Sequence, residues 1–367
     1  MAETSPHPIS LPSNQPPARF YQGGLRISDF RREAPAASNT PEDWVGSTTS
    51  VRGHSPIGMT RLPDGRLLAD AVAADPLAWL GPDHVERFGA DTMLLVKLLD
   101  AGQRLPIHAH PDGPFAAQYL GSVHGKAEAW YILTPGTVFL GLRDDIDASE
   151  LWKLVDTQQT ERMLALMHPV AVQPHDTVYV PPGLLHAIGE GILLAEVQEP
   201  EDLSILLEWT GFDLDGTVDG HLGLGFDLAL AAVETRGRTV EEIAALLRRR
   251  GGGSDAAADG SSQGVVDGAA LVTDSKEYFR LDRVTSDRDL PAGFTILIAL
   301  EGSMVLATGA GAGAGGGGAT ADTAGSAPNW STFELPAGTT VLLPFAAGAV
   351  SLTGEGTVLV ARPPEPR

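Results

Sequence analysis

The chain has no cysteine among its 367 residues. Disulfide bonds and thiolate metal sites are therefore excluded, so imidazole nitrogens and oxygen ligands would have to hold any bound metal. The lack of cysteine also suits a protein of a reducing compartment.

Long apolar stretches are missing as well. No segment approaches roughly 18 uninterrupted apolar residues, the length that a membrane-spanning helix needs. The segment from Met1 to Pro17 is polar and rich in proline, without the apolar centre of a signal peptide. We therefore expect a cytoplasmic protein that neither spans nor enters a membrane.

Basic residues are scarce. Lysine and arginine number 25 against 47 aspartates and glutamates, which gives a formal net charge of -22. Such a charge repels a phosphate backbone and an anionic lipid surface. Nucleic acid and membranes are therefore poor candidates as partners.

The length and texture of the chain predict a two-part, mainly β protein. Short apolar runs broken by Gly, Pro and Asp extend over residues 93–132 and again over residues 170–209, which is typical of strands joined by tight turns. Between these two regions, residues 148–166 include a helical pattern. A further helix is predicted from Thr239 to Arg250, where Thr239 and Glu242 form a capping box and the final arginines complement the helix dipole.

An internal repeat links the two halves. The segment that begins at Val172 and the one that begins at Glu334 share a Pro-x-x-Thr start, an apolar strand and a following proline, and each later reaches a Gly-Glu-Gly. Two copies of an all-β unit of about 100 residues predict a pair of jelly rolls.

We therefore expect a mainly β protein with two cupin (jelly-roll) domains and a helical segment between them. Low-complexity stretches rich in Gly, Ser and Ala predict a linker and a flexible loop. The predicted parts are a disordered tail (1–18), an N-terminal metal-binding cupin (19–225), a helix and linker (226–268), and a C-terminal cupin without a metal site (269–367) that carries a flexible Gly-rich loop (309–328).

All ten histidines lie at or before His221, so an imidazole metal site must belong to the first unit. His108 and His110 are two residues apart in a strand pattern, and side chains at i and i+2 point to one face of a strand. Glu128 follows on the next predicted strand, and His186 follows a Pro-Pro-Gly turn. Three imidazoles and one carboxylate suit Zn, Mn, Fe or Ni.

Taken singly, a His-x-His pair is more often an ordinary partly exposed strand feature than a metal site, and Glu128 alone reads as a surface acid. The ordered combination of His-x-His, Glu and Pro-x-Gly-x-x-His on successive strands is far more specific. It predicts one metal ion held by His108, His110, Glu128 and His186.

At these same residues the sequence resembles the type I mannose-6-phosphate (phosphomannose) isomerases of the cupin superfamily. The matching segments are Leu105-Pro-Ile-His-Ala-His-Pro-Asp, Gly125-Lys-Ala-Glu-Ala-Trp-Tyr-Ile-Leu, and the stretch from Val180 to Gln198. Weaker similarity includes Tyr21-Gln-Gly-Gly and Pro41-Glu-Asp-Trp and extends over most of the chain.

The resemblance implies a zinc-dependent interconversion of an aldose phosphate and its ketose isomer, with a sugar or sugar phosphate as the partner of a monomer or homodimer. The family's ligand positions correspond to the four residues named above, with His108 in place of the usual glutamine. The resemblance also implies that Lys126 contacts substrate or handles protons, and that Asp202 is an acid of the pocket. Glu196 is a second candidate acid, although a structural hydrogen bond would equally explain it.

One position departs from the family. After Asp202 the family places an arginine that contacts substrate, whereas Leu206 stands nearest to that position here. Leucine cannot donate to a phosphate or an enediolate oxygen, and Arg143 is a candidate substitute. The main interpretation is a mannose 6-phosphate isomerase; the alternatives are an isomerase of another or unphosphorylated sugar, and a sugar-binding cupin without turnover. An iron cupin oxygenase would use similar ligands, but the Gly-Lys-x-Glu-x-Trp-Tyr context argues against it.

Overall fold

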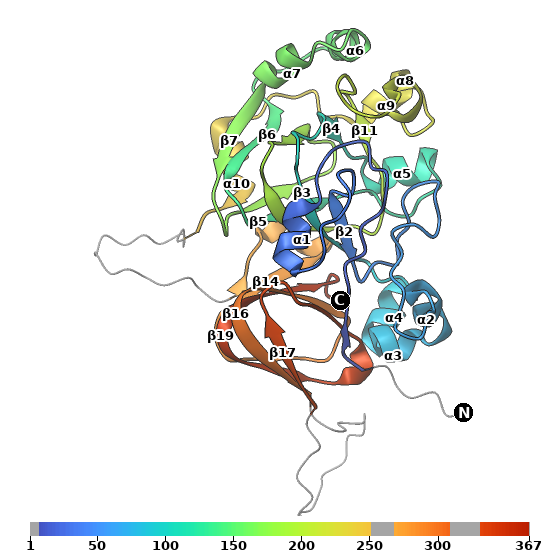
Figure 1. The fold of residues 1–367 in the computed structure, drawn as a ribbon. Helices are drawn as coiled ribbons and strands as arrows, with labels where there is room; N and C mark the ends of the chain where they lie inside the picture. Colours follow the sequence, from blue (N-terminus) through green and yellow to red (C-terminus); the bar gives the residue numbers. More distant parts are fainter. Residues whose placement is uncertain (1–6, 251–267, 309–330, 367) are drawn as a thin grey trace, which may run out of the picture.

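The computed structural model describes residues 7–250, 268–308 and 331–366, and these form two β-rich units packed against each other (Figure 1). The unit in green and cyan comes from the first two thirds of the chain, and the unit in orange and red comes from the last third. The predicted mainly β fold with two cupin units is confirmed.

Two facing antiparallel sheets build the first unit. Its six-stranded sheet runs in the order β12, β8, β5, β10, β3, β2, and its five-stranded sheet in the order β11, β4, β9, β6, β7. The strands of the six-stranded sheet are β2 (Glu42–Val45), β3 (Leu95–Asp100), β5 (Glu128–Ile132), β8 (Thr177–Val180), β10 (Leu193–Gln198) and β12 (Leu247–Arg248). Those of the five-stranded sheet are β4 (His108–Ala109), β6 (Gly136–Leu142), β7 (Met167–Val172), β9 (His186–Ile188) and β11 (Ile205–Leu206).

The strands β3, β5 and β10 are buried on both faces, so their sequences are apolar at most positions. The exceptions lie in register: Glu196 of β10 pairs with Lys97 of β3 on one side and with Trp130 of β5 on the other. Residues in register across a sheet project to the same face. The sheet therefore presents a row of polar and aromatic side chains, which also includes Trp44 opposite Lys97, on a single face.

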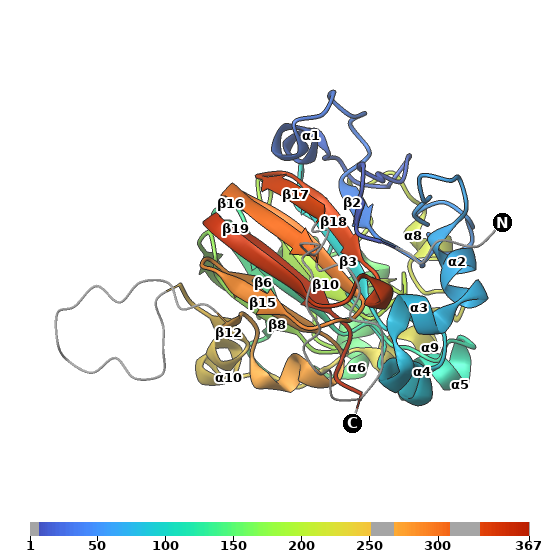
Figure 2. The same ribbon diagram turned by 90° about the horizontal axis from the view of Figure 1, so that it is seen from below.

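The second unit contains an eight-stranded antiparallel sheet among the described residues (Figure 2). Its long strands β16 and β19 pair along most of their length. The strands are β1 (Ile9–Ser10), β13 (Gly268–Ala269), β14 (Arg280–Val284), β15 (Arg288–Leu290), β16 (Thr295–Thr308), β17 (Ser331–Pro336), β18 (Thr340–Leu343) and β19 (Val350–Arg362). The strands β8 and β18 each lie in one copy of the internal repeat.

Residues 7–18 are not the disordered tail that their composition predicts. Ile9 and Ser10 of β1 pair with Leu342 and Val341 of β18, and the Leu11 amide donates to the Thr340 carbonyl at 3.0 Å. The Pro-rich composition of this segment gives no strand signal. The partner strand lies some 330 residues further along the chain, so no local pattern indicates the pairing. Residues 1–6 lie outside the described part of the chain.

Helices are short and lie at the ends and sides of the sheets (Figures 1 and 2). They are α1 (Leu25–Arg31), α2 (Leu68–Ala74), α3 (Pro76–Leu80), α4 (Pro82–Phe88), α5 (Gly113–Tyr119), α6 (Ala148–Asp156), α7 (Thr160–Leu166), α8 (Gly216–Asp219), α9 (Phe226–Ala229) and α10 (Val240–Ala245), with 3-10 turns at Leu230–Ala232, Thr273–Glu277 and Phe345–Ala347. In the described part of the chain, no helix combines the length and apolar character needed to cross a membrane.

The capping box at the start of α10 is confirmed, since the Thr239 hydroxyl accepts from the Glu242 amide and the Glu242 carboxylate accepts from the Thr239 amide. The predicted end at Arg250 is wrong. The helix ends at Ala245 because the next residues leave it to form β12, which pairs with the edge of β8. Arg249 then contacts the Asp176 carboxylate at 2.7 Å and does not complement a helix dipole.

An apolar cluster joins the two units, since buried side chains such as Trp130 and Leu98 of the first unit belong to the same core cluster as Ile296 and Phe279 of the second. The predicted boundaries at 19–225, 226–268 and 269–367 stay predictions. Most of the predicted linker (251–267) and the predicted Gly-rich loop (309–328) lie outside the described residues.

Candidate metal and substrate site

His108 and His186 face each other between the two short strands β4 and β9 of the five-stranded sheet. Their ring centroids lie 4.0 Å apart, and both side chains are buried. The Glu208 carboxylate anchors the start of β4 by accepting from the Ile107 amide at 3.0 Å, and it also binds Arg104. Two of the predicted ligands, His108 and His186, therefore lie on a fixed strand pair.

His110 comes one residue after the end of β4 and turns toward the same point, with its ring centroid 5.0 Å from that of His108 and 4.8 Å from that of His186. Gly183 holds the turn before His186: its φ of 83° is one that a glycine adopts freely, and its amide donates to the His110 carbonyl at 2.7 Å. The Pro-Pro-Gly turn that precedes His186 is thus tied by a hydrogen bond to His110, and the three imidazoles lie together.

Each of the three imidazoles donates its Nδ1 hydrogen to a backbone carbonyl: His108 to Pro106 at 2.8 Å, His186 to Leu184 at 2.8 Å, and His110 to Leu203 at 2.6 Å. A carbonyl oxygen can only accept, so Nδ1 carries the hydrogen and Nε2 presents a lone pair. These ligand atoms lie within 4.8 Å of one another. Fixing the tautomer through the outer nitrogen is the usual arrangement for a metal-binding histidine.

Glu128 projects from β5 on the facing sheet into the same space. Its carboxylate oxygens lie 3.1 Å from His110 Nε2 and 3.3 Å from His186 Nε2. Trp130 Nε1 donates to it at 3.0 Å, and Lys126 Nζ donates to it as well. Lys126 Nζ also lies 2.9 Å from His110 Nε2, so the carboxylate and this imidazole already hold one cation between them.

Burial lowers the pKa of His108 well below its ordinary value, and the neighbouring His186 and His110 lower it further. Burial, followed by the Lys126 ammonium, lowers the pKa of His110 to about 3. Burial alone would raise the pKa of Glu128, but Lys126 and His110 overcome this effect and hold that pKa well below its ordinary value. At neutral pH the imidazoles of His108 and His110 are therefore unprotonated and lie near an ionised carboxylate.

These protonation states are a test of whether a metal fits. The Nε2 atom of His186 lies 3.3 Å from a carboxylate oxygen of Glu128, and this nitrogen is buried without a hydrogen-bond partner among the described residues. Two acceptors in contact repel each other unless a cation or a proton lies between them. The donor set of three imidazoles, which could hold a metal ion, and an adjacent carboxylate suits a divalent ion of the borderline class.

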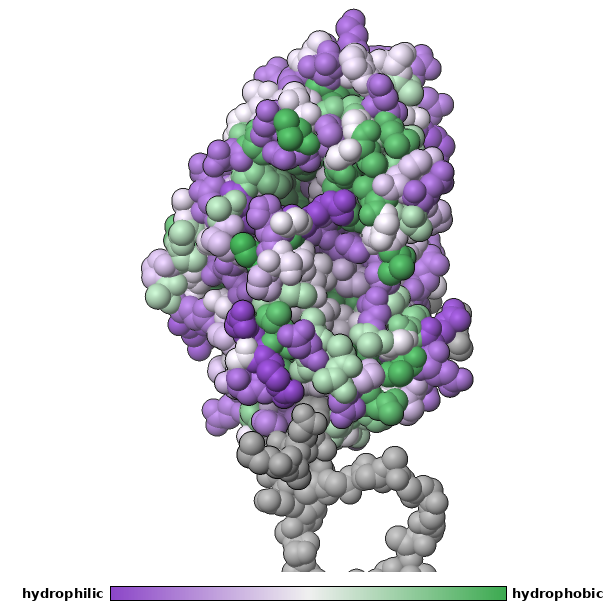
Figure 3. Space-filling view, turned by 90° about the vertical axis from the view of Figure 1, so that its right-hand side faces the viewer, coloured by the Kyte–Doolittle hydropathy of each residue, from purple (hydrophilic) through white to green (hydrophobic). Residues whose placement is uncertain are grey.

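A cavity of about 810 Å³ opens beside this cluster, and His108, Lys126 and Glu128 form part of its wall. Figure 3 shows the face of the molecule that carries α2 to α5, with a hollow between hydrophobic patches in its upper half. A volume of this size accommodates a small polar ligand such as a hexose phosphate.

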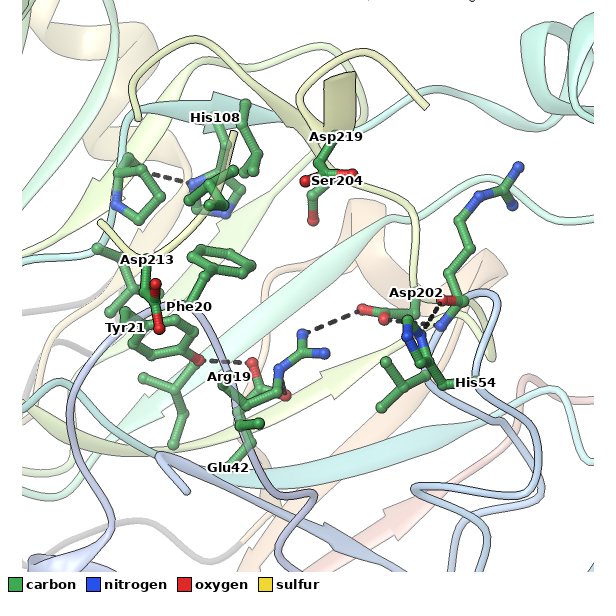
Figure 4. Close-up of a pocket in the computed structure, with 18 of the residues that line it drawn as sticks. Arg19, Phe20, Tyr21, Glu42, His54, His108, Asp202, Ser204, Asp213 and Asp219 are labelled. Carbon is green, nitrogen blue, oxygen red and sulfur yellow. Dashed lines mark hydrogen bonds and ion pairs between the residues drawn. The ribbon is translucent and has the colours of Figure 1, made fainter. Parts of the chain in front are cut away.

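The N-terminal segment supplies the opposite wall of the cavity (Figure 4). The Tyr21 hydroxyl donates to the Glu42 carboxylate. The Arg19 guanidinium lies between Glu42 at 3.6 Å and Asp202 at 3.7 Å. Burial would raise the pKa of Glu42, but Arg19 and Lys97 lower it to about 2.

Glu196 and Lys97 lie on the floor of the same cavity. Their charged atoms are 3.5 Å apart, and Lys97 Nζ also stacks over the Trp44 ring at 4.7 Å. Burial and the nearby Glu128 raise the pKa of Glu196. Its Oε1 is buried without a hydrogen-bond partner within the described ranges, which leaves it available to a ligand.

The predicted site residues are not all together. His108, Lys126, Glu128, Glu196 and Asp202 line the cavity. His110 and His186 stand directly behind that wall, in contact with Glu128.

Arg143 does not line the cavity, which corrects its predicted role in substrate binding. It follows the end of β6 on the outside of the sheet, where its Nε donates to the Met167 carbonyl at 2.8 Å. Leu206 of β11 does line the cavity, directly opposite His108 in the sheet.

Sequence reasoning missed Arg19, Glu42 and Lys97. Lys97 had a usable signal, because it is the one charged residue in the apolar run from Met93 to Leu99. A charge in a strand buried on both faces needs a partner or a function. Arg19 and Glu42 had no comparable signal, since only the folded chain brings them beside Lys97.

Comparison with known proteins agrees with this architecture. The chain is 29% identical over 168 residues to a mannose-6-phosphate isomerase of Streptococcus mutans, covering 44% of this chain and 50% of the relative. It is 30% identical over 190 residues to a probable mannose-6-phosphate isomerase, GmuF, of Bacillus subtilis, covering 49% and 55% respectively. The chain thus matches about half the length of these curated relatives. No protein-family model matches it.

Solved structures extend the likeness to the whole chain. A putative mannosephosphate isomerase from Archaeoglobus fulgidus superposes with a TM-score of 0.69 at 19% identity, with full coverage of both chains. The mannose 6-phosphate isomerase from Bacillus subtilis gives a TM-score of 0.66 at 22% identity, covering 97% of this chain and all of the other. The fold and the histidine cluster define a two-cupin protein with a candidate metal centre. Within that class, the chain is related in sequence to the mannose-6-phosphate isomerases and has the fold of the phosphomannose isomerases.

Proposed function

We propose that this protein is a sugar isomerase, an intramolecular oxidoreductase that interconverts mannose 6-phosphate and fructose 6-phosphate with the help of one divalent metal ion. The observation that carries the proposal is the cluster of three imidazoles whose ligand atoms lie within 4.8 Å of one another, two of them in contact with the Glu128 carboxylate, at the wall of a sugar-sized cavity. The sequence relationship to mannose-6-phosphate isomerases supports the choice of substrate.

His108, His110, Glu128 and His186 would hold the metal. Zinc fits this donor set best, and Mn, Fe or Ni would also suit it. A bound divalent ion supplies a positive charge that stabilises negative charge on the oxygens of the reacting sugar.

The remaining chemistry belongs to side chains of the cavity. Aldose-ketose isomerisation moves a proton between two adjacent carbons, so it needs a group that accepts the proton and returns it. Glu196 fits this task because its buried Oε1 has no hydrogen-bond partner within the described residues. Lys97, 3.5 Å from Glu196, stabilises the carboxylate form of that residue.

Lys126 is fixed by Glu128 and His110, so its ammonium is positioned to donate to a substrate oxygen next to the metal ligands. Asp202 instead contacts Arg19 and accepts from the Arg52 amide at 3.1 Å. These contacts support a positioning role for Asp202 in place of the acid role that the sequence suggested.

A coupled assay on purified, metal-loaded protein tests the proposal. We expect fructose 6-phosphate to form from mannose 6-phosphate, and formation from glucose 6-phosphate or free mannose to be much slower. Sugar binding by the metal-loaded protein with no product from any of these sugars would contradict the proposed activity and favour a binding protein.

A further inference from the structure

Four cationic side chains line the cavity: Arg19, Arg52, Lys97 and Lys126. Lys126 contacts both Glu128 and His110, and Lys97 lies between Glu42 and Glu196 while stacking over Trp44. Lys126 therefore lies among the proposed metal ligands and Lys97 beside the proposed proton acceptor Glu196, whereas Arg52 is exposed. A negatively charged group further from the metal would need a different cation.

Arg19 has hydrogen-bonding capacity to spare. Its contacts with Glu42 and Asp202, at 3.6 and 3.7 Å, are longer than hydrogen bonds. Its Nε is buried without a hydrogen-bond partner among the described residues, and the side chain is only 11% exposed. A buried donor of a charged group is costly to leave unpaired, and a guanidinium offers five N–H donors.

The backbone holds this guanidinium in place. The Arg19 amide donates to the Asn39 carbonyl at 3.0 Å, and the Asn39 side chain donates back to the Arg19 carbonyl at 3.1 Å. Figure 4 shows the Arg19 side chain between Glu42 and Asp202, reaching into the cavity. The donor group is therefore pre-oriented before any ligand arrives, which lowers the entropic cost of binding.

The wall that carries Leu206 offers no such donor. Leu206 lies opposite His108 across β11 and β4, and its apolar side chain lines the cavity there. Two guanidinium groups line the cavity, and the less exposed of them, that of Arg19, comes from the N-terminal segment.

The total charge of the cavity does not oppose an anion. Six carboxyl side chains and four cationic ones line it, so one divalent metal ion would balance their charge. Two of the carboxyl groups, on Asp213 and Asp219, come from the segment after β11 and have no ion pair with Arg19. Local placement of the donors, and not the net potential, then decides where an anionic group binds.

We propose that Arg19 is a specificity-determining residue that binds the phosphate group of the sugar phosphate. The proposal rests on the proposed function for its substrate. Arginine matches phosphate oxygens through paired N–H donors, and Glu42 and Asp202 keep the planar group oriented while leaving donors free.

Steady-state kinetics with Arg19→Met and Arg19→Lys test the proposal. Losing a charge-assisted hydrogen bond to phosphate should raise KM for mannose 6-phosphate about tenfold to hundredfold, with kcat changed far less. Lysine keeps the charge but loses the paired geometry, so Arg19→Lys should fall between the wild type and Arg19→Met. Any isomerisation of free mannose should be unaffected. Arg66→Met, which removes an exposed arginine outside the cavity, is the matched control.

An unchanged KM for mannose 6-phosphate in both Arg19 variants would overturn the proposal, as would an equal loss with free mannose. Calorimetric titration of the metal-loaded proteins with inorganic phosphate separates this result from the proposed function. Phosphate binding that is present in the wild type and in Arg66→Met but weakened in both Arg19 variants supports the phosphate site, even if no sugar turns over. Wild-type turnover without any phosphate binding, or with equal binding in all variants, overturns the phosphate site and leaves the isomerase proposal intact.

Discussion

At the scale of single residues, the proposed metal site depends on a carboxylate that faces two imidazoles. Replacing Glu128 by glutamine removes the negative charge while keeping the size of the side chain. Loss of an outer hydrogen-bond partner of a metal ligand already weakens metal binding by about tenfold or more. Glu128 would contact the metal directly, so we expect Glu128→Gln to weaken divalent metal binding by more than that. Metal content after gel filtration measures this loss. Glu190→Gln, an exposed acid near β9, is the control, and equal metal content in the two variants would contradict the assignment.

Glu42 makes a second residue-level prediction, about stability and pH. Its pKa of about 2 in the folded protein lies below the ordinary value of 4.5, so its contribution to stability is present above pH 4.5 and disappears as the pH falls toward 2. For a buried group this shift corresponds to about 3 kcal/mol. The stability difference between the wild type and Glu42→Gln should therefore be largest near pH 7 and shrink steadily below pH 4.5. Urea unfolding at pH 3, 5 and 7 measures it, and a difference that is constant with pH would refute the charge network.

At the scale of elements, the strand β1 ties the start of the chain to the second cupin unit. Ile9 and Leu11 are buried against β18, and Arg31 Nη2 donates to the Leu11 carbonyl at 2.9 Å. Deleting residues 1–11 should lower the free energy of unfolding by about 3 kcal/mol, the order expected for exposing two buried aliphatic side chains. Ser10→Ala, at an exposed position of β1, should have little effect. A deletion variant that unfolds at the same urea concentration as the full chain would show that this strand contributes nothing.

The elements also show what sequence patterns can and cannot predict. The ligand strands β4, β5 and β9 were predictable because their signals are local: a histidine pair, a glutamate two residues after a lysine, and a Pro-Pro-Gly turn. The end of α10 was not, because pairing with the edge of β8 competes with the helix and wins after Ala245. The strand β1 was not predictable either, because it pairs with a strand near the other end of the chain.

At the scale of the whole molecule, the cavity joins segments that no sequence window contains together. Arg19, Glu42, Lys97 and Asp202 meet there from four separate parts of the chain. The proposed metal ligands were predicted from their spacing, whereas the wall that faces them exists only in the folded protein. The apolar cluster that spans both units shows that the second unit contributes to the packing of the first. The sequence of the second unit, which has no histidine, indicated only that it holds no imidazole metal site.

The central claim is that one divalent ion, held by three imidazoles and a carboxylate, is needed for sugar isomerisation. Titrating chelator-stripped protein with zinc while following fructose 6-phosphate formation tests it most directly. The structure predicts negligible activity without metal and a linear rise that levels off at one equivalent per chain. Full activity in metal-free protein would contradict the account.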